Sequence, residues 1–271
     1  MPKWYGGNPS IEHQSLADWT TVMNKGDKWK FNVYRLPFKF STLDFGLMDQ
    51  IVDLAFKHKA RVVLDFHCLE QYKDEPKLGS IVLRELWAKV AHHYKANPKI
   101  MAYELANEPS EGCLTPALVG NNDAILHELA NLTDYIRKTD TLKMCVWSPS
   151  SFWGNIKVPQ KYRRINTVNA IHPYSYGKKK TWEELKAIAD YRMSLANNYV
   201  TQFDKGVWCG EIECHSSGAS TPDLEREYVI YTLNQCYMRG FGMSYWKYGG
   251  TDDYGQDPDN VISKTTYATT V

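Results

Sequence analysis

The feature that most constrains the fold of this 271-residue chain is the regular alternation of short apolar runs with longer amphipathic segments. Seven runs have the length and composition of buried β-strands: Phe31–Leu36, Arg61–Phe66, Ile100–Leu105, Met144–Trp147, Thr167–Ile171, Gly206–Cys209 and Met243–Trp246. Five helical patterns lie between them: Phe45–His58, Ser80–Tyr94, Asn122–Thr139, Thr181–Asn197 and Leu224–Arg239. Such alternation predicts a parallel sheet with right-handed crossovers.

The two ends of the chain carry weaker signals. A short, polar eighth strand is expected near Lys3–Gly6, followed by a helix at Ser15–Asn24. The C-terminal segment Thr265–Val271 is rich in β-branched residues, which are poor helix formers. We therefore predict an α/β fold, a single (β/α)₈ TIM-type barrel that forms one domain over residues 1–271 and is trimmed at its first strand and last helix.

Composition and charge exclude several classes of function. The net charge is +1 and there is no basic block, so no nucleic acid partner is expected. No stretch approaches transmembrane length, so no membrane partner is expected. No signal peptide follows Met1, and we expect a secreted protein only if a signal has been removed. The six cysteines lack metal or redox spacing and are predicted to be buried free thiols, with a Cys68–Cys113 bridge as the alternative.

Polar and aromatic side chains follow the predicted strands where core packing alone would place aliphatic ones. They are Arg35, His67, Asn107, Glu108, His172, Tyr174, Glu211 and Trp246. The strand-to-helix connections are long and the helix-to-strand connections are brief. Because the carboxyl ends of parallel strands share one face of a barrel, we expect these side chains to form one site.

Two of these residues are carboxylic acids, the minimum needed to break a glycosidic bond. A retaining glycosidase needs one ionised carboxylate and one carboxylic acid about 5–5.5 Å apart. Arg35 and Tyr174 can keep a neighbouring carboxylate ionised. Asn107 can bind a sugar hydroxyl, and Trp246 can stack on the apolar face of a sugar ring.

At this point the chain resembles glycoside hydrolase family 5, the cellulase-type branch of the retaining barrel glycosidases. The matching stretches are Tyr34–Pro37, Leu64–His67, Tyr103–Pro109, His172–Tyr174, Gly210-Glu211 and Tyr245-Trp246. The resemblance implies that Glu108 is the catalytic acid/base and Glu211 the nucleophile. It also implies that the substrate-binding positions are Arg35, His67, Asn107, His172, Tyr174 and Trp246.

The resemblance implies a retaining β-glycosidase whose partner is a polysaccharide or oligosaccharide. We expect a monomer that needs no cofactor, and no metal because the sequence has no metal-ligand spacing. The expected substrate is β-1,4-glucan. Mannan, mixed-linkage glucan, xyloglucan and β-1,3-glucan remain alternatives. Strand-end loops of about 8–14 residues favour an open groove and internal cleavage.

Two functions of other classes remain open. One is a catalytically inactive carbohydrate-binding barrel. The other is a metal-dependent hydrolase, in which His67 and His172 would bind metal together with His13 or His215. No His-x-His or His-Glu-x-x-His spacing supports the second.

Several residues have two interpretations. Glu213 is the rival nucleophile; it stands where the family often has glycine. Glu104 is expected to be a buried partner of a basic side chain. Trp87 and Trp147 are expected in the core. The aromatic residues that could instead line a sugar groove are Tyr72, Trp153, Tyr176, Trp4 and Tyr5.

Overall fold

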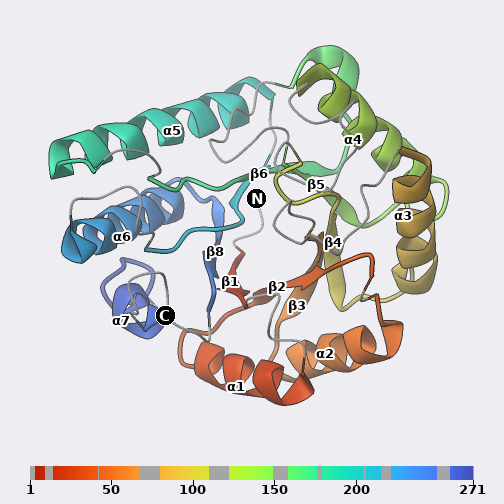
Figure 1. Ribbon diagram of the computed structural model, residues 1–271, viewed down its shortest axis with the longest axis horizontal. Coiled ribbons are helices and arrows are strands. Elements are labelled where there is room, and N and C mark those ends of the chain that lie inside the picture. Colours follow the sequence, from red (N-terminus) through yellow and green to blue (C-terminus); the bar gives the residue numbers. More distant parts are fainter. Residues whose placement is uncertain are drawn as a thin grey trace.

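Eight parallel strands form a closed barrel in which each strand pairs with its sequence neighbours and β8 pairs with β1 (Figure 1). The computed structural model describes residues 4–9, 15–41, 43–67, 80–109, 122–148, 158–175, 179–203, 206–214, 221–248 and 257–270. The strands are β1 Tyr5–Asn8, β2 Val33–Phe38, β3 Arg61–Phe66, β4 Ile100–Glu104, β5 Met144–Trp147, β6 Thr167–Ile171, β7 Gly206–Cys209 and β8 Gly242–Trp246. The predicted barrel is confirmed.

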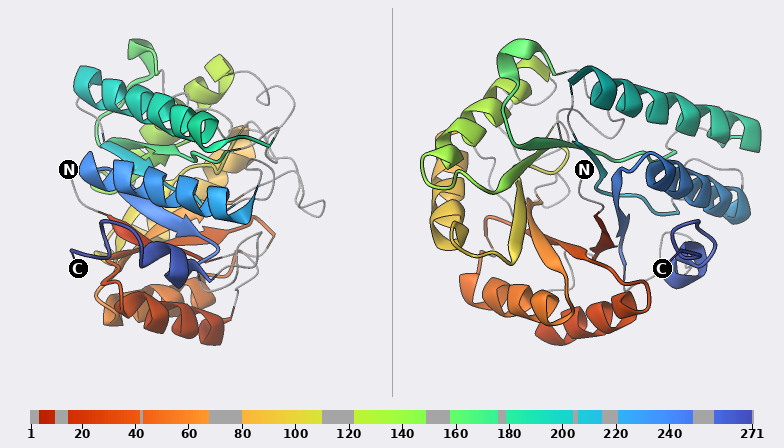
Figure 2. Two further views of the ribbon diagram at one scale, coloured as in Figure 1. Left: turned by 90° about the vertical axis from the view of Figure 1, so that its left-hand side faces the viewer. Right: turned by 180° about the vertical axis from the view of Figure 1, so that it is seen from behind.

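A ring of helices surrounds the strands (Figures 1 and 2). They are α1 Leu16–Asp27, α2 Phe45–Lys57, α3 Ser80–Tyr94, α4 Asn122–Arg137, α5 Trp182–Phe203, α6 Pro222–Met238 and α7 Pro258–Ile262. Between β5 and β6, the described residues contain one 3₁₀ turn, η1 Gln160–Tyr162. None of the described helices is both long and apolar enough to cross a bilayer.

The barrel is trimmed at the predicted places. Strand β1 has four residues, begins two residues later than expected, and pairs with both β2 and β8. A Cβ atom at Gly6 would lie 1.8 Å from the carbonyl oxygen of Val33, so only glycine permits this close approach of β1 to β2. Helix α7 has five residues and begins with an Asp257 N-cap followed by Pro258.

Buried apolar residues form two clusters, one of which packs among the strands. Its members are Trp4, Val33, Val63, Ala102, Val146, Val168, Ala170 and Trp208. The larger cluster includes the residues packed between strands and helices, with Trp87 and Trp147 in it as predicted.

The expectation that Trp4 and Tyr5 line a sugar groove is wrong. The Trp4 ring packs edge-on against Trp208 with ring centroids 5.7 Å apart, and Tyr5 packs on Tyr267 with centroids 4.6 Å apart. Both residues stand at the start of β1, at the opposite end of the strand from the carboxyl-terminal face.

The two-residue period of the strands explains how polar groups enter the barrel. Val33 belongs to the inner cluster, and Arg35 follows on the same face of β2. On β3, Val63 is followed in the same way by Asp65 and then by His67. The inner face therefore changes from apolar to charged toward the carboxyl ends of the strands.

The described cysteines agree with the prediction of buried free thiols. They are Cys145, Cys209, Cys214 and Cys236. Cys68 and Cys113, proposed as an alternative disulfide pair, lie outside the described residues.

Candidate active site

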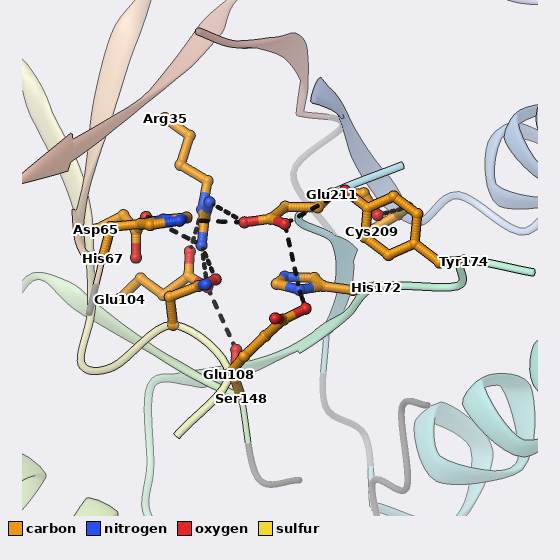
Figure 3. Close-up of polar contacts among 11 residues, drawn as sticks. Arg35, Asp65, His67, Glu104, Glu108, Ser148, His172, Tyr174, Cys209 and Glu211 are labelled. Atoms are coloured by element: carbon orange, nitrogen blue, oxygen red, sulfur yellow. Dashed lines mark hydrogen bonds and ion pairs between the residues drawn. The ribbon is translucent and has the colours of Figure 1, made fainter. Parts of the chain in front are cut away.

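The guanidinium of Arg35 lies at the centre of the site and is 0% exposed (Figure 3). Nε donates to Glu104 Oε2 at 2.7 Å and Nη2 to Glu104 Oε1 at 2.9 Å, a bidentate ion pair. Nη1 donates to Glu211 Oε1 at 2.5 Å, and Nη2 to Asn107 Oδ1 at 2.6 Å. Asp65 Oδ2 lies 3.1 Å from Nη2. Glu104 is thus the buried partner of a basic residue, as predicted.

Glu211 follows β7 and is surrounded by groups that favour its ionised form. Besides Arg35, the Tyr174 hydroxyl donates to Oε2 at 3.4 Å, and His172 Nδ1 lies 3.7 Å from Oε2. His67 Nδ1 lies 4.0 Å from Oε1. Burial raises the pKa of Glu211, but the charges of His172, Arg35 and His67 outweigh it and lower this pKa to about 2. The carboxyl group is therefore ionised at neutral pH.

The His172 ring lies between the two candidate catalytic carboxyl groups (Figure 3). Nδ1 is 2.6 Å from Glu108 Oε1. Burial lowers the pKa of His172, but Glu211 and Glu108 outweigh this effect and raise it to about 9, so the imidazole is protonated at neutral pH. One oxygen of each carboxyl and one ring nitrogen all lie within 4.8 Å of one another. A Cβ atom at Gly210 would lie 3.0 Å from Nε2, so glycine leaves room for this ring.

Asn107 and Glu108 leave the end of β4 in an unusual backbone conformation. Glu108 has φ = 39°, a left-handed conformation that non-glycine residues rarely adopt. Such conformations concentrate at functional sites. The backbone N–H of Asn107 donates to Phe66 O at 2.9 Å, which ties this turn to β3. Asn107 Oδ1 is bound by Arg35, while its Nδ2 is buried with no hydrogen-bond partner among the described residues.

The third part of the site joins His67 to Trp246 at the end of β8. Their rings are parallel within 7° and their centroids are 5.2 Å apart. Asp65 Oδ2 lies 2.6 Å from His67 Nδ1, which orients the imidazole. All eight predicted site residues are thus connected through contacts in one cluster.

Three side chains of this cluster, Glu108, His172 and Glu211, have a donor set that could hold a metal ion. The raised pKa of His172 argues for a different interpretation. A metal ion would compete with this proton for the ring, because a histidine binds metal only in its neutral form, and Nδ1 already lies 2.6 Å from Glu108 Oε1. The three side chains form one buried cluster of two carboxyl groups and an imidazole.

Glu213, the rival nucleophile, lies in a different environment. Its Oε1 is 3.9 Å from Lys247 Nζ, whereas Glu211 directly contacts Arg35. Several residues considered from the sequence lie outside the described residues: His13, Tyr72, Trp153, Tyr176 and His215.

Sequence reasoning missed two residues that shape the site, Asp65 and Gly210. Asp65 could have been found from its spacing, since it stands two residues before His67 on the same face of β3. Gly210 could not be found in this way, because nothing in the local sequence shows that the His172 ring packs against it.

Comparisons with known proteins identify the family of the chain. Residues 3–252 match the family described as cellulase (glycosyl hydrolase family 5). The chain belongs to glycosyl hydrolase family 5. Mannan endo-1,4-beta-mannosidase A of Aspergillus aculeatus is 25% identical over 191 residues, or 63% of this chain and 45% of that protein. The chain therefore spans less than half the length of this curated relative.

Solved structures with low identity share the barrel. The cellulose synthase subunit Z of Clostridioides difficile superposes with a TM-score of 0.74 at 20% identity, covering 98% of this chain and 100% of that chain. Thermotoga maritima Cel5A, in a mutant form with cellobiose, superposes with a TM-score of 0.73 at 16% identity, covering 96% of each chain. Another structure of Cel5A contains mannotriose. The family 5 member described here thus shares its barrel fold with these structures.

The charge on His172 predicts a measurable effect on stability. A pKa that rises from 6.5 to about 9 on folding corresponds to about 3 kcal/mol. The folded state then binds a proton that the unfolded state releases, so this stabilisation is present below pH 6.5 and is lost as the pH rises through 9. His172→Gln should remove that part of the pH dependence, measured by urea unfolding between pH 6 and pH 10. The control is His93→Gln, which removes a half-exposed histidine that pairs with Asp49. Equal slopes for wild type and His172→Gln would contradict the prediction.

Proposed function

We propose that this protein is a retaining endo-β-glycosidase that hydrolyses β-1,4-glucan by double displacement. One observation carries the proposal: two buried carboxyl groups from β4 and β7 have oxygens within 4.8 Å of each other, with a charged histidine between them. This spacing fits a retaining site, where the carboxyl groups are about 5–5.5 Å apart, better than an inverting site, which needs about 6.5–9.5 Å.

In this mechanism Glu211 attacks the anomeric carbon and Glu108 protonates the leaving oxygen. Glu211 suits the first role because its pKa of about 2 keeps it ionised. A glycosyl ester forms on Glu211. Glu108, now a carboxylate, then takes a proton from a water molecule that attacks the anomeric carbon, and the bond from this carbon to Glu211 breaks to free the Glu211 carboxylate. The sugar that reacts is held by Asn107 Nδ2, by Tyr174 and by the face of Trp246 that does not contact His67.

The nucleophile role of Glu211 predicts a specific chemical rescue. Glu211→Ala should lower turnover by at least about 10⁴-fold while the fold persists. Azide should restore part of the activity on an aryl glycoside and give a glycosyl azide of inverted configuration, since it attacks from the face that the carboxylate occupied. The matched control is Glu213→Ala. If azide rescues Glu213→Ala and not Glu211→Ala, the assignment is wrong.

The acid/base role of Glu108 predicts a dependence on the leaving group. Glu108→Ala should slow substrates with poor leaving groups by about 10²–10⁴-fold, because only these need protonation. Aryl glycosides with good leaving groups should form the glycosyl ester almost normally, and azide should then give a product of retained configuration. Comparing kcat/KM for the two substrate types tests the role, and equal losses on both would contradict it.

The sugar and the cleavage pattern are tested with a panel of polysaccharides. The viscosity of soluble cellulose should fall well before reducing ends accumulate, and early products should be mixed oligomers. Mannan is the second candidate, since the curated relative is a mannosidase. Activity on mannan alone would change the sugar and leave the mechanism intact. Early release of a single disaccharide would contradict internal cleavage, and loss of activity after dialysis against a chelator would favour the metal-dependent alternative.

A further inference from the structure

The segment after β6 that carries His172 and Tyr174 is held by side chains from outside the barrel. Three consecutive backbone carbonyls each accept a hydrogen bond from a different side chain. The Tyr228 hydroxyl of α6 donates to Pro173 O, and Arg192 Nη1 of α5 donates to Tyr174 O. Lys180 Nζ donates to Ser175 O at 2.9 Å.

These donors belong to a larger buried network. The Ser175 hydroxyl contacts both oxygens of Glu225 on α6, at 2.8 and 2.7 Å, and Arg192 Nη1 also donates to the Tyr228 hydroxyl at 3.2 Å. Glu225 and Tyr228 are 0% exposed and Arg192 is 9% exposed. Burying such charges costs free energy, and apolar residues of similar size often stabilise a fold as well or better. The network therefore points to a positional role.

The position it sets is that of two groups in the active site. His172 Nδ1 contacts Glu108 Oε1 at 2.6 Å, and the Tyr174 hydroxyl contacts Glu211 Oε2 at 3.4 Å. A shift of the backbone at 173–175 moves both groups at once. We propose that Arg192, Tyr228 and Glu225 form a clamp that positions His172 and Tyr174 against the two carboxyl groups; its role in turnover rests on the proposed function.

The clamp has an electrostatic consequence for Glu211. The charged and titratable groups that face this carboxyl are Arg35 from β2, His67 after β3, Glu108 after β4, Cys209 of β7, and His172 and Tyr174 after β6. Only the last two belong to the clamped segment. Loosening the clamp moves the imidazolium away and raises the pKa of Glu211 part of the way, because Arg35 and His67 remain.

The test is Tyr228→Phe, which keeps the buried ring and removes the hydroxyl that binds Pro173 O. We expect kcat to fall by about 10–100-fold, as for displaced catalytic groups, with little change in KM. The acid limb of the kcat/KM profile should move to higher pH. The matched control is Tyr231→Phe, on the same helix, whose hydroxyl donates to Asp190 Oδ1 of α5 at 2.5 Å. It should leave kcat and the pH profile unchanged.

A second pair of variants, at Arg192, keeps the clamp testable if Tyr228→Phe does not fold. Arg192→Ala should show the same loss of kcat and the same shift of the acid limb. Added guanidinium should restore both in part, and Arg192→Lys, which keeps a charged donor, should fall between wild type and Arg192→Ala. A residue that only stabilised the fold would lower the melting temperature without moving the acid limb.

A measurement independent of activity separates this inference from the proposed function. The ring nitrogens of His172, followed by ¹⁵N NMR against pH, should report a pKa near 9 in the wild type and in Tyr231→Phe. They should report a lower value in Tyr228→Phe and Arg192→Ala. A wild type that hydrolyses no polysaccharide would refute the function while this titration still tests the clamp. The clamp would be overturned if Tyr228→Phe and Arg192→Ala kept the kcat of the wild type, its acid limb and its His172 titration.

Discussion

The rest of the site depends on the ion pairs and hydrogen bonds of the buried Arg35 guanidinium. A charge that is 0% exposed must be fully compensated, since an unpaired buried ion costs several kcal/mol. The planar fork of arginine meets this need by reaching Glu104 with two nitrogens while it also binds Asn107 and Glu211. One side chain on β2 thereby fixes groups from the ends of β4 and β7. Lysine, a single point charge, could not hold all three partners.

The placement of His172 lets the site change its chemistry without changing its charge. In the proposed first step Glu211 loses its charge by forming an ester, and Glu108 gains one by giving up its proton. The imidazolium contacts the first carboxyl at 3.7 Å and the second at 2.6 Å, so it has an anionic neighbour before and after the step. A buried cluster that keeps its net charge needs no solvent reorganisation, which is the benefit of a preorganised site.

The strands and most site residues could be predicted because their signals are local. The length of a buried strand can be read from its apolar run in the sequence. Residues just after such a run lie at the carboxyl-terminal face, independently of the conformation of the following loop. Strand β1 gave a weak signal because closing the barrel requires Gly6, which has no side chain to pack. For the same reason Trp4 and Tyr5 were misplaced, since the start of that strand could not be located.

The clamp illustrates what sequence reasoning could not reach. Arg192 and Tyr228 stand 18 and 55 residues along the chain from the carbonyls they bind, on two helices. Neither residue has a sequence motif around it, and each one alone would be taken for an ordinary core or surface residue. Only the packing of α5 and α6 against the barrel brings them to one backbone segment. Contacts of this kind follow from tertiary packing, which local periodicity does not encode.

The residues that stabilise the barrel and the residues of the candidate site lie in successive layers along the same strands. The apolar layer of Val33, Val63 and Trp208 lies toward the amino ends and supplies tight packing, while Arg35 and Asp65 begin the charged layer above it. The charged layer alone would lower the free energy of unfolding, because removing its charges from water opposes folding. The packed layer below, together with the helices around the barrel, offsets that cost and holds the strands rigid. Arg35 stands where the two layers meet, so its guanidinium connects the rigid packed strands to Glu104 and to Glu211 in the charged layer.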